Sequence, residues 1–177
     1  MKKEFEKYMT TYRLGWMILS GIFLGLLIMF IVCFFLGMDV KPIGLPIFGG
    51  GFLLTLIPLW KSRKFFKILE DSNQMDMVLQ DFSAATPMRK DQIRFGQRWI
   101  FCKGKAFMIP YERVHQVYQY IHKTNFVEDE RWLKCVDDQG KTRKLCRLDL
   151  RGKSDAELQS MIRLIWSKNP GVKIGYQ

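Results

Sequence analysis

The sequence predicts an α+β protein in which a two-helix transmembrane hairpin precedes a small antiparallel β-sheet or half-barrel. Two uncharged stretches, residues 14–38 and 42–60, are each long enough to cross a bilayer as a helix. After residue 90, short apolar runs separated by turn residues indicate strands. The last apolar positions, residues 158–166, have the spacing of one helical face and predict a closing amphipathic helix.

The first uncharged stretch predicts a membrane helix over residues 14–38. Its 25 residues reach about 38 Å as a helix, more than the ~30 Å hydrocarbon core of a bilayer. The alternative is a secretory signal peptide, whose shorter apolar region ends in small residues before a cleavage site. Phe34, Phe35 and Leu36 stand where those small residues belong, so the pattern favours an uncleaved helix.

The second stretch, residues 42–60, predicts another span with an imperfect helix, because it contains three prolines and four glycines. Neighbouring groups satisfy backbone atoms that a proline leaves unpaired inside a membrane, so the stretch can still cross. The alternative is a re-entrant or interfacial segment. Only residues 39–41 connect the two stretches, and so short a connection favours an antiparallel hairpin.

The positions of basic residues predict the orientation of the hairpin. Lys and Arg are concentrated outside its two ends, in the segments 1–13 and 61–67, whereas the connecting turn contains only Lys41. Because cytoplasmic flanks carry an excess of Lys and Arg, both termini are expected in the cytoplasm, with the protein integral to the cytoplasmic membrane. Trp16 and Trp60 are then expected at the inner interface, where amphipathic indoles are enriched.

The candidate lipid-binding residues surround this inner interface. They are the two tryptophans and the basic residues that follow the second span: Trp16, Trp60, Lys61, Arg63, Lys64 and Lys67. Each cation close to an anionic leaflet contributes on the order of 1 kcal/mol of attraction. The alternative, that the basic residues do no more than fix the topology, is equally consistent with the sequence.

Gly21 and Gly25 form a G-x-x-x-G pair within the first span. Small residues at this spacing allow another helix to approach closely. We expect them to pack the two helices of the hairpin against each other, with dimerisation through this face as the alternative.

Residues 61–86 predict a juxtamembrane helix with a polar break at residues 70–74, ended by the Thr86–Pro87 pair. The cytoplasmic domain is expected over residues 90–177. Its predicted strands lie within residues 93–101, 106–110, 114–121, 132–136 and 142–148. A capping box from Ser154 to Glu157 starts the last helix, and Asn169, Pro170 and Gly171 end it.

Four short strings in the C-terminal part carry a family resemblance. They are GQRWIFC at residues 96–102, MIPYERVHQVY at 108–118, DDQGK at 137–141 and NPGVKIGY at 169–176. Over roughly residues 60–177 the chain resembles uncharacterised bacterial membrane proteins, mainly of Firmicutes, that join a helical hairpin to a YcxB-like, pleckstrin-homology-like domain. The resemblance implies a small β-barrel or half-barrel capped by a helix and implies no reaction. The chain offers about five predicted strands where that fold has seven.

The sequence favours a protein that is not an enzyme and has no cofactor. His115 and His122 are seven residues apart, which places them on opposite faces of a regular strand and prevents them from sharing one metal ion. No Ser, Cys or carboxylate near either forms a nucleophile–base pair, so no catalytic or metal residues are assigned. The run Glu128–Asp129–Glu130 is expected to be a solvated turn.

The leading functional hypothesis is a membrane-anchored binding module of the inner leaflet that engages a protein partner or anionic lipid headgroups. The net charge of +11 suits an anionic partner but does not choose one. The alternative is a membrane-tethered nucleic-acid-binding domain, for which the pI near 9.6 and aromatic residues such as Tyr118 and Tyr120 are the motivation. The membrane accounts for much of the positive charge, so nucleic acid is the less favoured partner.

Overall fold

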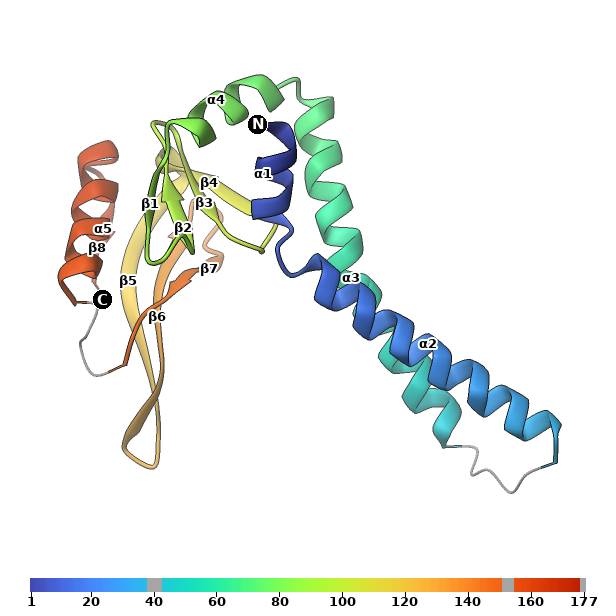
Figure 1. Ribbon diagram of the computed structural model, residues 1–177. Helices are drawn as coiled ribbons and strands as arrows, with labels where there is room; N and C mark the ends of the chain where they lie inside the picture. Colours follow the sequence, from blue (N-terminus) through green and yellow to red (C-terminus); the bar gives the residue numbers. More distant parts are fainter. Residues whose placement is uncertain (38–42, 151–154, 176–177) are drawn as a thin grey trace. The chain divides into compact units, whose positions relative to one another are not determined.

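The computed structural model describes residues 1–37, 43–150 and 155–175 and divides the chain into two compact units (Figure 1). The hairpin unit comprises Thr10–Asn73 with Gly104–Ala106. The sheet unit comprises Met1–Met9, Gln74–Lys103 and Phe107–Gln177. The first nine residues therefore belong to the same unit as the β-strands, although they precede both long helices.

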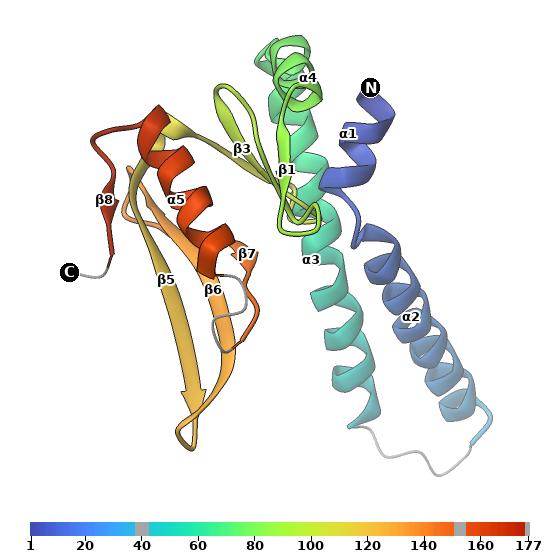
Figure 2. The same cartoon turned by 60° about the vertical axis from the view of Figure 1, so that its left-hand side comes forward.

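The hairpin unit contains two long helices, α2 at Arg13–Phe35 and α3 at Gly44–Asp71, which lie side by side (Figure 2). Both are long and apolar enough to cross a membrane. Only 6% and 11% of their most apolar windows are buried within the protein, so these are not core helices of a globular fold. Helix α3 continues through Pro58 and past Trp60, and it includes the first part of the predicted juxtamembrane helix.

The close approach of the two helices occurs at glycines other than the predicted pair. A Cβ atom added to Gly44 or Gly51 would overlap the ring of Phe30 or Phe23. A Cβ atom added to Gly21 or Gly25 would meet no atom of the described chain within 4 Å. The expectation that Gly21 and Gly25 pack the hairpin is therefore corrected: phenylalanine rings on α2 need the space that glycines on α3 leave.

Two four-stranded sheets form most of the sheet unit (Figure 1). The first is an antiparallel meander of β1 Thr86–Met88, β2 Ile93–Phe95, β3 Trp99–Cys102 and β4 Phe107–Pro110. After the short 3₁₀ helix Tyr111–Arg113, the second sheet has the order β7-β6-β5-β8, with β5 Val114–Thr124, β6 Val127–Asp137, β7 Thr142–Arg147 and β8 Lys173–Ile174. Strand β8, which the sequence did not predict, pairs parallel to β5.

One hydrophobic core joins both sheets to helix α5, Asp155–Lys168. The helix contributes four buried residues at helical spacing: Leu158, Met161, Ile162 and Ile165. Three buried cysteines, Cys102, Cys135 and Cys146, belong to the same core, where a thiol packs as a small apolar group. The capping residue predicted for this helix, Ser154, lies outside the described residues.

The predicted run at residues 93–101 is two strands rather than one, because a tight turn at Gly96–Arg98 divides it. The carboxylate of Asp81 holds that turn: it accepts hydrogen bonds from the backbone N–H groups of Gln97 and Trp99 at 2.6 and 3.1 Å, and from Arg98. Gly96 is required there, since a Cβ atom would overlap the Asp81 carboxylate. Sequence periodicity does not detect a turn fixed by a distant side chain.

The acidic run Glu128–Asp129–Glu130 lies within strand β6, so its prediction as a turn was wrong. The β5–β6 hairpin is longer than expected because cross-strand pairs extend it. Asp129 Oδ1 lies 2.8 Å from His122 Nδ1, and Asp129 Oδ2 accepts a hydrogen bond from Thr124 at 2.6 Å. The turn is therefore at Asn125–Phe126, where both residues have positive φ.

Helices α1, Lys2–Met9, and α4, Met75–Ser83, pack against each other and against the first sheet. The fully buried Phe5 meets the rings of Phe82 and Phe101 edge-on, at centroid separations of 5.1 and 6.1 Å. Tyr8 adds a tilted contact to Phe82. Strand β3 is buried on both faces as a result, which is why its four residues show no alternation of exposure.

Candidate functional site

The predicted lipid-binding residues lie on both helices of the hairpin unit. Trp16 is 39% exposed on α2 and Trp60 is 62% exposed on α3. The ammonium group of Lys64 lies 5.2 Å from the centroid of the Trp60 ring, a cation–π contact. Lys61, Arg63, Lys64 and Lys67 all lie exposed on α3, so the helix presents them beside its tryptophan.

The register of the two helices places the tryptophans at one level. Phe23 on α2 lies against Gly51 on α3, and Phe30 lies against Gly44, which sets an antiparallel alignment. Seven residues before Phe23 on α2 is Trp16, and seven residues after Gly51 on α3 is Pro58, so the antiparallel register brings Trp16 level with Pro58. Two residues correspond to about 3 Å along a helix, so Trp16 and Trp60 occupy the same level of the hairpin.

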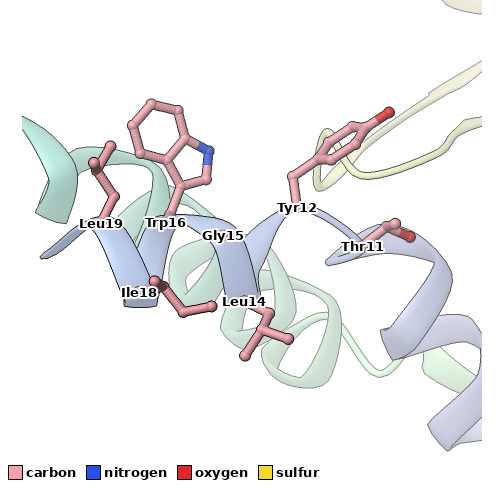
Figure 3. Close-up of a pocket in the computed structure, with 7 residues that line it drawn as sticks. All are labelled: Thr11, Tyr12, Leu14, Gly15, Trp16, Ile18 and Leu19. Atoms are coloured by element: carbon pink, nitrogen blue, oxygen red, sulfur yellow. The ribbon is translucent and has the colours of Figure 1, made fainter. Parts of the chain in front are cut away.

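A groove of about 730 Å³ lies at the start of α2 (Figure 3). Its lining is largely apolar and comprises Thr11, Tyr12, Leu14, Gly15, Trp16, Ile18 and Leu19. The rings of Tyr12 and Trp16 and the side chain of Leu19 project from the same side of the chain in this view. The groove lies beside the predicted interfacial tryptophan, but the sequence pattern did not identify it, because it depends on how the chain turns into α2.

Polar side chains occupy buried positions in the hairpin between Arg13 and Ser62. Ser20 on α2 and Thr55 and Ser62 on α3 are buried, and the two α3 residues are seven positions apart. Thr55 Oγ1 donates a hydrogen bond to the backbone oxygen of Phe52 at 2.6 Å. Two buried atoms, Arg13 Nε and Ser62 Oγ, make no hydrogen bond within the described chain.

In the sheet unit, Arg94 connects helix α1 to the first sheet. Its guanidinium lies 4.8 Å from the centroid of the Tyr8 ring and 4.6 Å from that of Phe82, between the two helices. Its Nε donates to Asp91 at 2.6 Å, and Nη1 lies 3.7 Å from the Glu4 carboxylate. One side chain thus contacts α1, α4 and the β1–β2 connection.

The pKa of Tyr8 and the pKa of Asp91 in this cluster both depart from their usual values. Burial, followed by the negative charge of Asp91, raises the pKa of Tyr8 far above its usual value, so the phenol stays protonated and donates to the Phe101 backbone oxygen at 3.3 Å. Burial also acts to raise the pKa of Asp91, but hydrogen bonds and positive charge from Arg94 and Lys103 outweigh it and lower that pKa. The cluster therefore holds complementary charges near neutral pH.

The second sheet carries an aromatic and basic face formed by Tyr120, Trp132, Lys134 and Lys144. The ammonium of Lys134 lies 3.1 Å from the Tyr120 ring centroid, and that of Lys144 lies 4.7 Å from the Trp132 ring centroid. Burial, and then the charge of Lys144, lowers the pKa of Lys134. Tyr118 is buried, so its ring is not an open stacking platform, and a lysine occupies one face of the Tyr120 ring.

The tip of the β5–β6 hairpin exposes apolar side chains. Phe126 is 100% exposed at the turn with φ of 65°, and Val127 next to it is 62% exposed. Positive φ is unusual for a bulky aromatic residue, and glycine is the usual occupant of such a turn. The chain therefore exposes a large apolar side chain in a strained conformation at the end of a projecting ribbon (Figure 2).

His115 and His122 lie on the same strand, β5, and both are exposed. His122 is engaged by Asp129, as described above. Within residues 1–37, 43–150 and 155–175, no group of three or more His, Cys, Asp or Glu side chains is arranged to hold a metal ion.

Comparison with known proteins gives no relative: no family, no curated protein and no solved structure matches the chain.

Proposed function

We propose that the protein is a membrane-anchored, non-enzymatic binding module whose hairpin crosses the cytoplasmic membrane twice and whose sheet unit acts at the inner leaflet. The observation that carries this proposal is that both ends of the hairpin continue into one folded unit. Helix α1 ends at Met9, four residues before α2 begins, and α4 begins at Met75, four residues after α3 ends. Those two flanking helices pack together through Phe5, Tyr8 and Phe82.

This packing constrains the topology independently of charge. Because α1 and α4 belong to one core, both ends of a membrane-spanning hairpin must lie on the same side of the bilayer. The basic flanking residues place that side in the cytoplasm. A signal peptide is disfavoured by the same observation, since cleavage after the first span would remove Phe5 and Tyr8 from the core of the sheet unit.

The architecture of the sheet unit also supports the proposal. Strands β1–β4 and β5–β7 are formed from consecutive segments and are followed by helix α5, which supports the pleckstrin-homology-like arrangement that the family resemblance implies; strand β8 then adds a parallel edge to β5. Such folds serve many binding functions, so the fold supports a binding module and not a particular ligand. Ile121, Phe126 and Val127 are exposed at the same end of the β5–β6 hairpin, and we assign this tip to a protein partner because contiguous exposed apolar side chains mark contact sites.

Membrane insertion is tested on the full chain, because a fragment that begins after the hairpin lacks α1. The protein should remain in the pellet after alkaline carbonate extraction of membranes. Cysteines introduced as Lys3→Cys and Gly171→Cys should resist a membrane-impermeant maleimide in right-side-out vesicles and react after permeabilisation. Release by carbonate, or labelling of either cysteine in sealed vesicles, would contradict the proposal.

The partner surface is tested by replacing Phe126 with a photo-crosslinking phenylalanine in the full chain in its native membrane. A discrete protein adduct is expected at this position, with none at Gln139, which lies in the polar turn between β6 and β7. Adducts with lipid at position 126 would instead assign the tip to the bilayer, and equal adducts at both positions would remove the assignment.

A further inference from the structure

Strand β6 divides its side chains between the two faces of the second sheet. Leu133 and Cys135 are fully buried in the hydrophobic core. Because successive side chains of a strand point to opposite faces, Trp132 and Lys134 project from the face that is turned away from this core. Tyr120 on β5 is the register partner of Trp132 and extends the same face across the hairpin. The aromatic and basic face is therefore the outward face of the second sheet.

The outward face places cations from two neighbouring strands side by side. Lys134 on β6 is the register partner of Lys144 on β7, and Trp132 is the register partner of Arg147. Paired residues project from the same face of a sheet, so Arg147 belongs to the aromatic and basic face as well. Like charges directly opposite each other destabilise a sheet, and this arrangement therefore favours the binding of an anion.

The carboxylate contacts on this face involve Lys144 and not the other two cations. Glu130 Oε2 lies 3.9 Å from Lys144 Nζ and accepts a hydrogen bond from the indole N–H of Trp132 at 3.2 Å. Within residues 1–37, 43–150 and 155–175, neither Lys134 nor Arg147 forms an ion pair. Both cations can therefore donate hydrogen bonds to an anion from outside the protein.

Lys134 has the least solvent of the three cations. Its side chain is partly buried, and its ammonium group lies 3.1 Å from the centroid of the Tyr120 ring. Burial, and then the charge of Lys144, lowers the pKa of Lys134, so its surroundings within the protein disfavour its charged form. An anion that binds both ammonium groups would offset this cost, because it replaces repulsion with charge-assisted hydrogen bonds.

The aromatic residues and the short connections to the hairpin favour lipid as the source of this anion. Tyr120 and Trp132 each combine an apolar ring with a polar atom, and such side chains are enriched at membrane interfaces. Only residues 10–12 separate α1 from α2, and only residues 72–74 separate α3 from α4. When the hairpin crosses a membrane, such short connections give lipid headgroups a higher effective concentration at the sheet unit than a dissolved anion has.

We propose that the aromatic and basic face binds the phosphate groups of anionic phospholipids, with Lys134 and Lys144 as the principal ligands and Arg147 as a third cation. The inference deepens the proposed function and rests on it, because it requires the sheet unit to lie at the inner leaflet. It concerns a different surface from the tip at Phe126, which we assign to a protein partner.

Lipid contact is measured on the full chain in nanodiscs, by the quenching of a fluorophore on this face by lipids with nitroxide-labelled headgroups. Thr142 is exposed on β7, two residues before Lys144 and on the same face, so Thr142→Cys provides the labelling position. Cys33→Ala removes the partly exposed native thiol, and the other three cysteines are buried. Quenching should be at least about twofold stronger with phosphatidylglycerol than with phosphatidylcholine alone, and high salt should remove most of this difference.

Lys134→Gln combined with Lys144→Gln should reduce the quenching to the level seen with phosphatidylcholine, because it removes both ammonium groups. Lys134→Arg combined with Lys144→Arg keeps both charges and should retain most of the quenching. The matched control is Arg163→Gln combined with Lys168→Gln, which removes two charges from exposed positions on α5. Because α5 packs on the core side of the sheet, this control should leave the quenching within about 1.5-fold.

Three outcomes would overturn the proposal. Equal losses in the lysine pair and in the α5 control would show a diffuse effect of net charge. Equal quenching with the two lipids would show that the face does not select an anion. Loss of quenching on addition of inorganic phosphate at constant ionic strength would show a site for free phosphate, whereas lipid binding should resist it.

A further arm tests an acidic protein segment as the occupant. Binding of an oligoglutamate peptide to this face in phosphatidylcholine discs, without quenching in phosphatidylglycerol discs, would assign the face to such a segment and overturn the proposal. Carbonate extraction of the same variants reports insertion separately: a protein released from membranes contradicts the proposed function, whereas an inserted protein without phosphatidylglycerol-dependent quenching contradicts only this inference. Near-ultraviolet circular dichroism of each variant excludes loss of folding as the cause.

Discussion

The hairpin unit and the sheet unit are both packed, but they use opposite kinds of residue at their contacts. In the sheet unit, large apolar side chains such as Phe5, Phe82 and Phe101 are fully buried. In the hairpin unit, the buried residues include Ser20, Thr55 and Ser62, while most of the large apolar side chains point outward. Water drives apolar groups inward, whereas lipid does not, so helices surrounded by lipid associate through small residues that allow close approach.

The two units also use glycine for different purposes. Gly96 in the sheet unit makes room for a carboxylate that holds a turn, and Gly51 in the hairpin unit makes room for the ring of Phe23. The first supports backbone hydrogen bonds and the second supports helix contact. Substitutions at the two kinds of contact should therefore change different measurable quantities.

The largest effect is expected from Phe5→Ala, which tests whether the first helix belongs to the sheet unit. Truncation of a fully buried phenylalanine should lower the free energy of unfolding by about 3–5 kcal/mol, although residue 5 precedes both long helices. Denaturant titration of the full chain in detergent, followed by near-ultraviolet circular dichroism, measures it. Phe126→Ala, at the fully exposed tip, should change stability by less than about 0.5 kcal/mol. Similar effects of the two substitutions would show that α1 is not part of the core.

A smaller effect is expected from Gly51→Leu in the hairpin. The new side chain would overlap Phe23 and force the helices apart, at a cost of about 1–3 kcal/mol. Cysteine crosslinking between α2 and α3 in detergent micelles should fall accordingly. Gly21→Leu is the matched control, because a side chain there meets open space. If Gly21→Leu separates the helices as strongly as Gly51→Leu, the contact surface described here is wrong.

The smallest effect is expected from the acid sensitivity of Asp91. Its pKa is lowered in the folded protein, so its ionised form contributes stability above the unfolded value of 3.8, and this contribution is lost as the pH falls through the lower native pKa. The group is partly exposed, and the contribution is at most about 1 kcal/mol. Asp91→Asn should therefore lower Tm slightly at pH 7 and progressively less as the pH falls through the native pKa of Asp91. A Tm difference that persists unchanged at pH 2 would exclude this origin.

The sequence predicted those helices and strands that are determined by the composition and periodicity of their own segment. The uncharged stretches predicted α2 and the start of α3 to within a few residues, because length and hydrophobicity alone determine whether a helix can span a bilayer, but α3 continues eleven residues beyond the second stretch, to Asp71. The positions of strands β3, β5 and β7 and of helix α5 followed from apolar periodicity and turn residues. The expectation that Trp16 and Trp60 lie at one interface followed from the basic flanks that orient the hairpin.

Other features depended on contacts between distant residues. The turn that divides β2 from β3 requires Asp81, fifteen positions before Gly96, and the parallel strand β8 exists only because β5 offers it an edge. The acidic run lies in strand β6 rather than in a turn, and its Asp129 side chain contacts His122 and Thr124 across the hairpin. A periodic pattern in one segment contains no information about a partner in another segment.

By itself, the sequence determined that this chain contains two membrane-length apolar helices joined to a basic α+β part, because hydrophobicity and charge are properties of each segment alone. Only the tertiary structure decided that the first nine residues join the core of the sheet unit, and that Gly44 and Gly51, not Gly21 and Gly25, lie at the helix contact. Only it revealed the unsatisfied atoms of Arg13 and Ser62. The physical reason is that burial, close approach and hydrogen-bond satisfaction are relations between segments, and they exist only after the chain has folded.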